Sequence, residues 1–153
     1  MAKATEAFGW EQRQPVREGR IRRGYGLAFA MQGSGVAGAE LGGASLKLNE
    51  DGSFNLLTGA ADVGQGSDTV MRQIAAETLD ISADEIVVAS ADTDLTTFDC
   101  GCYASSTTYI SGSGVMAAAQ DARRQILEVA ARVLDLDADE LDIHNGVVFG
   151  PDG

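Results

Sequence analysis

A glycine-rich turn lies directly before a segment with the pattern of a helix. The turn consists of Val63, Gly64, Gln65 and Gly66, and the helical pattern runs over Ser67–Leu79. Backbone N–H groups at a helix start have no partner within the helix and lie at the positive end of its dipole, which favours anions. Glycines let a ligand approach the backbone closely, and a glutamine amide both donates and accepts hydrogen bonds. The turn is therefore a candidate site for phosphates and polar heterocycles.

A second segment of the chain is rich in hydroxyl groups at the start of another predicted helix. It comprises Ala104, Ser105, Ser106, Thr107 and Thr108. Hydroxyl and backbone donors at a helix start suit phosphate or pyrophosphate oxygens, and two such helix starts could face one elongated ligand. The alternative is that these side chains only cap the helix and make the loop polar.

Other reactive side chains give weaker signals. Cys100 and Cys102 are the only cysteines, and two thiols without a second Cys or His pair do not indicate a metal site. His144 is the sole histidine and falls in a predicted turn, which favours a surface position. Three acidic residues of one loop are expected to fix turns rather than bind a cation: Asp92, Asp94 and Asp99. No nucleophile is paired with a base, so we expect no catalytic residue and no metal ligand.

Composition narrows the classes of function. The chain has 153 residues and 44% hydrophobic content, which fits one globular domain, and it contains no apolar run of about 18 residues. We therefore expect no membrane partner, and without a secretory signal we expect a cytoplasmic location. The net charge of −12 argues against binding nucleic acid. Any anionic ligand must then be held by local backbone donors and hydroxyls.

Strands are predicted to deliver the chain to the glycine-rich turn. Residues 44–49 and 53–58 alternate around the turn signal Asn49–Gly52, which predicts a β-hairpin whose second strand leads directly into the site. The helix over Ser67–Leu79 has an apolar stripe, with Ser67 or Asp68 as its expected cap. A short β-rich segment follows it.

The N-terminal part of the chain is predicted to be a separate segment. Residues 1–22 are polar and are expected to be a tail or linker that ends a preceding element, and residues 23–153 are expected to form the domain. Strict alternation over Gly24–Met31 predicts a strand with one bulky face. The Gly- and Ala-rich stretch Gln32–Gly43 is expected to be a loop.

The C-terminal half is predicted to repeat a helix, turn and strand. A long helix is expected over Ser105–Leu134, with Gly112 and Gly114 marking close packing or a ligand. The sequence after Leu79 recurs in similar form after Leu134, each copy leading into an apolar stretch. The final strand at 147–149 has no returning partner after it, which suggests an excised piece. Together these elements predict an α/β (α+β) fold, a two-layer domain with a mixed or antiparallel sheet and two main helices on one face.

The two candidate segments in this order and spacing carry a family resemblance. The chain resembles the molybdopterin-binding region of the large subunit in the xanthine dehydrogenase and aldehyde oxidase family. The resemblance lies in GAADVGQGSDTVMRQIAAETL followed by ADTDLTTFDCGCYASSTTYISGSGV. The likeness covers Gly24–Phe149. Three segments look closest to the 4-hydroxybenzoyl-CoA reductase branch: RRGYGLA, DTD and LDLDADELDIHNGVVF.

The resemblance implies roles for both segments. Val63–Gly66 would lie beside the pterin and the molybdenum, and Ala104–Thr108 would hold the pyranopterin phosphate or a cytosine dinucleotide extension. Many relatives carry an arginine where this chain has Ser106. This departure would weaken phosphate binding and leaves the form of the cofactor open.

The resemblance also implies an oxidoreductase with several parts. Family members hydroxylate, or in the benzoyl-CoA branch reductively dehydroxylate, a substrate at molybdenum and pass electrons through iron–sulfur clusters and FAD on other subunits or domains. They use a glutamate and a second glycine-rich loop from other segments of the large subunit. We therefore expect the remainder of that subunit as a partner, and an isolated chain that is inactive and without cofactor. The competing interpretation is a non-catalytic protein-interaction module whose loops only connect strands.

Overall fold

The structure is a computed structural model that describes residues 2–34 and 41–151. The chain forms two compact units, residues 1–32 and 33–153. The loop predicted over Gln32–Gly43 falls in part on residues 35–40, which lie outside the described residues. Both candidate segments of the sequence belong to the second unit.

The first unit is small and has little interior. It contains the helices α1 (Ala2–Phe8) and η1 (Trp10–Gln12) and an antiparallel hairpin of β1 (Val16–Glu18) and β2 (Ile21–Arg23). The Phe8 ring lies 6.1 Å from the Trp10 ring, measured between centroids. None of the residues of α1 and η1 is buried.

The strand predicted over Gly24–Met31 is wrong. The structure assigns no strand to these residues, and the bulky side chains of the alternating pattern are exposed, from 43% for Tyr25 to 100% for Met31. A strand exists only when a neighbouring strand accepts its hydrogen bonds. No strand within residues 2–34 and 41–151 pairs with this segment.

A three-stranded mixed sheet is the base of the second unit. Strands β3 (Ala44–Leu48) and β4 (Phe54–Thr58) form the predicted hairpin, and β5 (Ile86–Ser90) pairs parallel to β4. A parallel neighbour needs a long crossover, which α2 (Ser67–Leu79) supplies at the predicted residues. The spatial order is β3-β4-β5.

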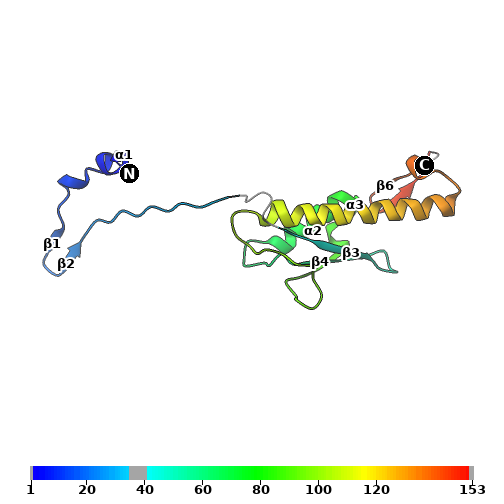
Figure 1. The fold of residues 1–153 in the computed structure, drawn as a ribbon, viewed down its shortest axis with the longest axis horizontal. Helices are drawn as coiled ribbons and strands as arrows, with labels where there is room; N and C mark the ends of the chain where they lie inside the picture. Colours follow the sequence, from blue (N-terminus) through cyan, green and yellow to red (C-terminus); the bar gives the residue numbers. More distant parts are fainter. Residues whose placement is uncertain (1, 35–40, 152–153) are drawn as a thin grey trace. The chain divides into compact units, whose positions relative to one another are not determined.

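Both long helices cover the same face of this sheet, as Figure 1 shows. Alternate strand residues point to that face and meet the apolar stripes of α2 and α3 (Thr107–Leu134). The predicted two-layer α/β fold is therefore confirmed. The buried core consists of Phe54, Leu56, Ala60, Met71, Ala75, Ala76, Leu79, Ile86, Val115 and Ala119.

Helix α3 begins at Thr107 rather than at the predicted Ser105. The backbone φ of Ser105 is 57°, in the left-handed region, so this residue lies outside the helix. The glycines near the helix start mark packing, since a Cβ at Gly112 would lie 2.8 Å from the Ile74 side chain. A Cβ at Gly114 would lie 3.0 Å from the Gly42 carbonyl oxygen. No helix in the described part of the chain is long and apolar enough to cross a membrane.

The predicted repeat is confirmed in detail. Each long helix ends at an aspartate in the left-handed conformation, Asp80 with φ 54° and Asp135 with φ 56°. In each copy a short 3₁₀ helix follows, η2 (Ala83–Glu85) or η3 (Ala138–Glu140), and then a strand. The same local sequence therefore produces the same helix ending twice.

The C-terminal strand has a partner, contrary to the prediction from the sequence. Strand β7 (Val147–Phe149) pairs antiparallel with β6 (Asp142–His144), so the turn predicted at His144 is wrong. This hairpin packs on the second half of α3 through Leu141 and Ile143, which are buried. His144 is exposed as predicted, and its Nδ1 lies 2.9 Å from Asp80 Oδ2, which joins the hairpin to the end of α2.

Candidate functional site

The turn before α2 is organised by Asp62. Its Oδ1 accepts hydrogen bonds from the N–H groups of Gly64 at 2.8 Å and of Gly66 at 3.3 Å. Both glycines have positive φ, 103° and 81°, which a side chain would disfavour. Gly66, and neither Ser67 nor Asp68, occupies the cap position, so the predicted cap is wrong. The Asp62 carboxylate already fills the anion position at this helix start.

The electrostatics of this turn follow from the same contacts. The hydrogen bond from the Gly64 N–H, with weaker ones from the following backbone N–H groups, holds the pKa of the Asp62 carboxyl below its ordinary value of 3.8. An anionic ligand at this helix start would have to displace a carboxylate that the backbone stabilises. The α2 turn is therefore better suited to a neutral polar group than to a phosphate.

We expect the amide resonances of Gly64 and Gly66 to titrate with a midpoint below pH 3.8. Because the pKa is lower in the folded chain, the stabilisation is complete above about pH 3.8 and disappears as the pH falls through the lowered pKa. An NMR pH titration checks this. The Asp62→Asn variant should lose the titration, whereas Asp84→Asn, at an exposed position, should keep it. A midpoint at or above 3.8 would contradict the assigned contacts.

Gln65 is turned back onto its own loop. Its Oε1 accepts from the Val63 N–H at 2.6 Å, and its Nε2 donates to the Ala61 carbonyl at 2.9 Å. A further Nε2 contact reaches Cys102 Sγ at 3.4 Å. The side chain is thus held in one orientation at the surface of the turn.

Cys102 connects the two candidate segments, which the sequence analysis did not predict. Its thiol donates to the Ala61 carbonyl at 2.7 Å and accepts from Gln65. The loop that leads into α3 therefore lies against the loop that leads into α2. Cys102 is 41 residues from Ala61, and no local pattern signals a contact over that separation.

The hydroxyl-rich segment divides into buried and accessible groups. Ser106 is 4% exposed, and its Oγ donates to the Tyr103 carbonyl at 2.9 Å. Ser105 and Thr108 are exposed and Thr107 is half-buried. The cap residue Ser106 makes no side-chain cap hydrogen bond, so the capping interpretation is not observed. The N–H groups at the start of α3 therefore remain a suitable site for a ligand anion.

Buried polar atoms without a partner lie beside these segments. Ser67 is 3% exposed, and its Oγ has no hydrogen bond within the described part of the chain. The same holds for the buried atoms Asp68 Oδ1, Arg72 Nε and Thr97 Oγ1. Leaving such atoms unpaired is costly, so a ligand with many donors and acceptors fits this end of the domain.

The remaining candidates do not form a second site. Residues 2–34 and 41–151 hold no group of three or more His, Cys, Asp or Glu side chains that could bind a metal ion. Asp92 shapes a turn as predicted, since its Oδ1 accepts from the Asp94 N–H at 2.9 Å.

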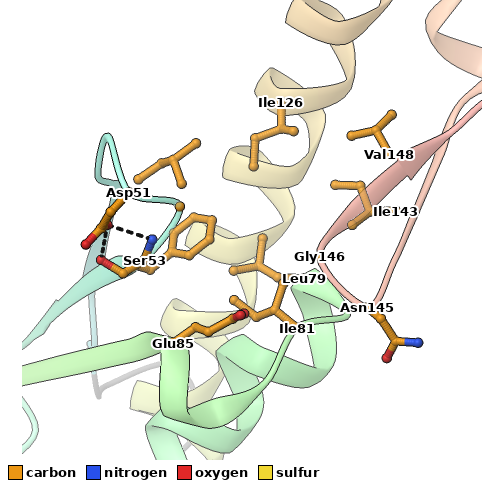
Figure 2. A pocket seen from close by; sticks show the side chains of 13 residues that line it. Asp51, Ser53, Leu79, Ile81, Glu85, Ile126, Ile143, Asn145, Gly146 and Val148 are labelled. Carbon is orange, nitrogen blue, oxygen red and sulfur yellow. Dashed lines mark hydrogen bonds between the residues drawn. The ribbon is translucent and has the colours of Figure 1, made fainter.

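A cavity of about 390 Å³ lies between the end of α2, the β3-β4 turn and the β6-β7 hairpin (Figure 2). Its lining includes Leu79 and Ile81, so it lies at the opposite end of α2 from the glycine-rich turn.

Comparison with known proteins identifies the relatives of this chain. The sequence profile of the family described as "Molybdopterin cofactor-binding domain" matches residues 3–152. The xanthine dehydrogenase molybdenum-binding subunit of Escherichia coli O157:H7 is 35% identical over 152 residues, which is 95% of this chain. The gamma subunit of the 6-hydroxypseudooxynicotine dehydrogenase complex of Paenarthrobacter nicotinovorans is 30% identical over 136 residues, which is 89% of this chain and 17% of the relative.

A solved structure shows the same fold. Quinoline 2-oxidoreductase from Pseudomonas putida 86 matches with a TM-score of 0.66 and 28% identity, over 72% of this chain and 14% of the other. The chain spans about 20% of the length of the Escherichia coli relative. The fold, the matched residues and the relatives agree: the chain belongs to the molybdopterin cofactor-binding domains of the xanthine dehydrogenase and aldehyde oxidase family.

Proposed function

We propose that Val63–Gly66 and Ala104–Thr108 together form one side of a molybdenum cofactor site in a molybdenum hydroxylase-type oxidoreductase. The observation that carries this proposal is the junction at Cys102, which joins the two loops at one end of the domain through hydrogen bonds to Ala61 and Gln65. Two helix starts held side by side can contact one elongated ligand. The cofactor, when bound, supplies two-electron redox chemistry at the metal.

The two segments have different chemical roles in this proposal. The start of α3 offers backbone N–H groups with no side-chain cap and the exposed hydroxyls of Ser105 and Thr108, which suit phosphate oxygens. The α2 turn holds the carboxylate of Asp62 and presents the amide of Gln65. This turn suits the neutral pterin and the neighbourhood of the metal.

The proposal extends to the parts of the enzyme that lie outside this chain. The remainder of a large subunit would supply the opposing wall of the site, and iron–sulfur and FAD subunits or domains would carry the electrons. The Escherichia coli relative is a molybdenum-binding subunit and the Paenarthrobacter nicotinovorans relative is a subunit of a dehydrogenase complex, which supports this arrangement. On its own the chain would be inactive, since half a site neither excludes water nor places substrate.

The finer identity of the enzyme rests on the sequence resemblance. We propose a 4-hydroxybenzoyl-CoA reductase-like branch, with the cofactor either as molybdopterin or as its cytosine dinucleotide. Mild acid treatment of the extracted cofactor distinguishes the two forms, because only the dinucleotide releases cytidine monophosphate. Turnover with an aromatic acyl-CoA, compared with xanthine, tests the branch.

Replacing Gln65 by alanine in the assembled enzyme should lower its molybdenum and pterin content about tenfold. The change removes the amide and the three hydrogen bonds that order the turn, and a net loss of this size follows from one to two such bonds. Metal analysis and pterin fluorescence of the purified enzyme measure the content. Gln73→Ala, at an exposed position of α2, is the matched control and should leave the content unchanged. Undiminished content in Gln65→Ala would remove the basis of the proposal.

A further inference from the structure

The amide protons of Gln65 are both engaged within the protein. A glutamine amide nitrogen carries two protons, and here Nε2 has two acceptors, the Ala61 carbonyl at 2.9 Å and Cys102 Sγ at 3.4 Å. The amide oxygen accepts from the Val63 N–H and keeps one lone pair. In this orientation Gln65 offers a ligand an acceptor and no donor.

The contacts with Val63, Ala61 and Cys102 together fix which orientation the amide adopts. If the amide were flipped, its oxygen would face the Ala61 carbonyl and the sulfur, and its NH₂ group would face the Val63 N–H. The NH₂ group would then face another donor, the Val63 N–H, and the amide oxygen would face another acceptor, the Ala61 carbonyl. The thiol reinforces the observed orientation because it also donates to the Ala61 carbonyl at 2.7 Å, which fixes the position of the shared acceptor.

Cys102 reaches this position from a different loop. The neighbouring Cys100 faces away, since its Sγ accepts from the Leu41 N–H at 2.9 Å. Gly101 between them has φ 120°, which allows the chain to place the two thiols on different partners. Cys102 is thus the cysteine that is hydrogen-bonded to the Gln65 turn, and its contact spans 37 residues.

We propose that Cys102 is a positioning residue that holds the Gln65 amide with its oxygen available to the ligand and both its protons turned inward. The inference rests on the proposed function, in which Gln65 contacts the cofactor. It adds that Gln65 serves as a hydrogen-bond acceptor for a donor group of the ligand. The Cys102 thiol contacts the loop before α2 twice, at the Ala61 carbonyl and at the Gln65 amide.

The effect of Cys102 on the Gln65 amide is measured on the 153-residue chain without cofactor. The probe is the exchange rate with solvent of the Gln65 side-chain amide protons, observed by NMR with nitrogen-15 labelling. Cys102→Ala should raise the exchange rate of one Gln65 proton about three- to tenfold, since one hydrogen bond is lost. Cys102→Ser should restore slow exchange, because a hydroxyl donates and accepts in the same way. Cys100→Ala is the matched control and should change nothing at Gln65.

The consequence for the cofactor is measured in the assembled enzyme by molybdenum and pterin content. Cys102→Ala should lower the content about three- to tenfold, and Cys102→Ser should restore it. If Cys102 acts through Gln65, then adding Cys102→Ala to Gln65→Ala should cause no further loss. A merely structural role would instead give additive losses in the double variant.

The outcomes separate the inference from the proposed function. Slow exchange at Gln65 in Cys102→Ala, or normal content in Cys102→Ala beside low content in Gln65→Ala, would overturn the role of Cys102 and leave the cofactor site in place. Additive losses would likewise overturn it. Normal content in Gln65→Ala would overturn the proposed function itself, whatever the exchange rates show.

Discussion

Replacing Gly59 by alanine should destabilise the chain by about 3 kcal/mol, the largest effect that we expect from adding a single methyl group. Gly59 directly follows β4 and precedes the glycine-rich turn. A Cβ at this position would lie 2.7 Å from the Asp99 Cβ and 3.0 Å from the Asp99 backbone nitrogen, and it would also overlap the Thr97 carbonyl oxygen. Backbone atoms cannot rotate away, so one of the two loops must move.

Gly112→Ala is the matched control for this prediction. A Cβ at Gly112 would lie 2.8 Å from the terminal methyl of Ile74, which a change of rotamer can relieve. Alanine also favours the helix by up to about 1 kcal/mol over glycine, which offsets part of the cost. Urea unfolding followed by circular dichroism measures both variants. Equal stability losses in the two would show that backbone contact at Gly59 is not the cause.

The effect of Gly59→Ala should extend to the candidate site. The loop 97–99 that it displaces leads directly to Cys102, whose thiol contacts Ala61 and Gln65. Even where the variant folds, the junction between the two loops should be disturbed. If the proposed cofactor site holds, Gly59→Ala should lower cofactor content by changing the spacing of the loops and not by removing a contact with the cofactor.

Local patterns were sufficient for much of the fold. The alternation on both sides of Asn49–Gly52 predicted the hairpin, and the apolar stripe of Ser67–Leu79 predicted α2. The repeated helix ending was readable because a left-handed aspartate and a short 3₁₀ turn depend on neighbouring residues only. These signals lie within one or two turns of chain, so the sequence carries them directly.

Pairing between distant segments could not be read in the same way. The alternation over Gly24–Met31 has the period of a strand, yet this segment pairs with no other in the described residues. The reverse error occurred at Asp142–His144, where polar and turn-forming residues form a strand because β7 lies beside them. Propensity describes one segment, whereas a strand depends on its neighbour as well.

In the candidate site too, local features could be predicted from the sequence and contacts formed on folding could not. Residue types predicted that both helix starts carry donors, and Gly64 and Gly66 predicted a turn without bulky side chains. The sequence did not predict that the Asp62 carboxylate accepts from the Gly64 and Gly66 N–H groups or that Ser106 is buried. Both facts depend on side-chain directions after folding. The Asp62 contacts leave the start of α3, where the resemblance already implied the phosphate, better suited to an anion than the start of α2.

Asp99→Ala should cost about 2 to 3 kcal/mol, because it removes the acceptor of a buried hydroxyl. Asp99 Oδ2 accepts from Ser111 Oγ at 2.5 Å, and Oδ1 accepts from the Gly101 N–H at 2.8 Å. Ser111 is 2% exposed, so its hydroxyl would lose its acceptor at a buried position. Asp94→Ala, at an exposed position in the same loop, is the control and should stay within about 0.5 kcal/mol of the parent chain.

A double-mutant cycle shows whether this pair fixes the loop to α3. Ser111→Ala alone should cost less than Asp99→Ala, because it removes a buried hydroxyl and leaves the charge partly hydrated. We expect a coupling energy of about 1 to 2 kcal/mol between the two positions in urea unfolding. A coupling energy near zero would mean that the contact does not hold the loop. Since that loop carries Cys102 toward Gln65, strong coupling would identify Asp99 and Ser111 as the pair that holds the two proposed cofactor-binding segments together.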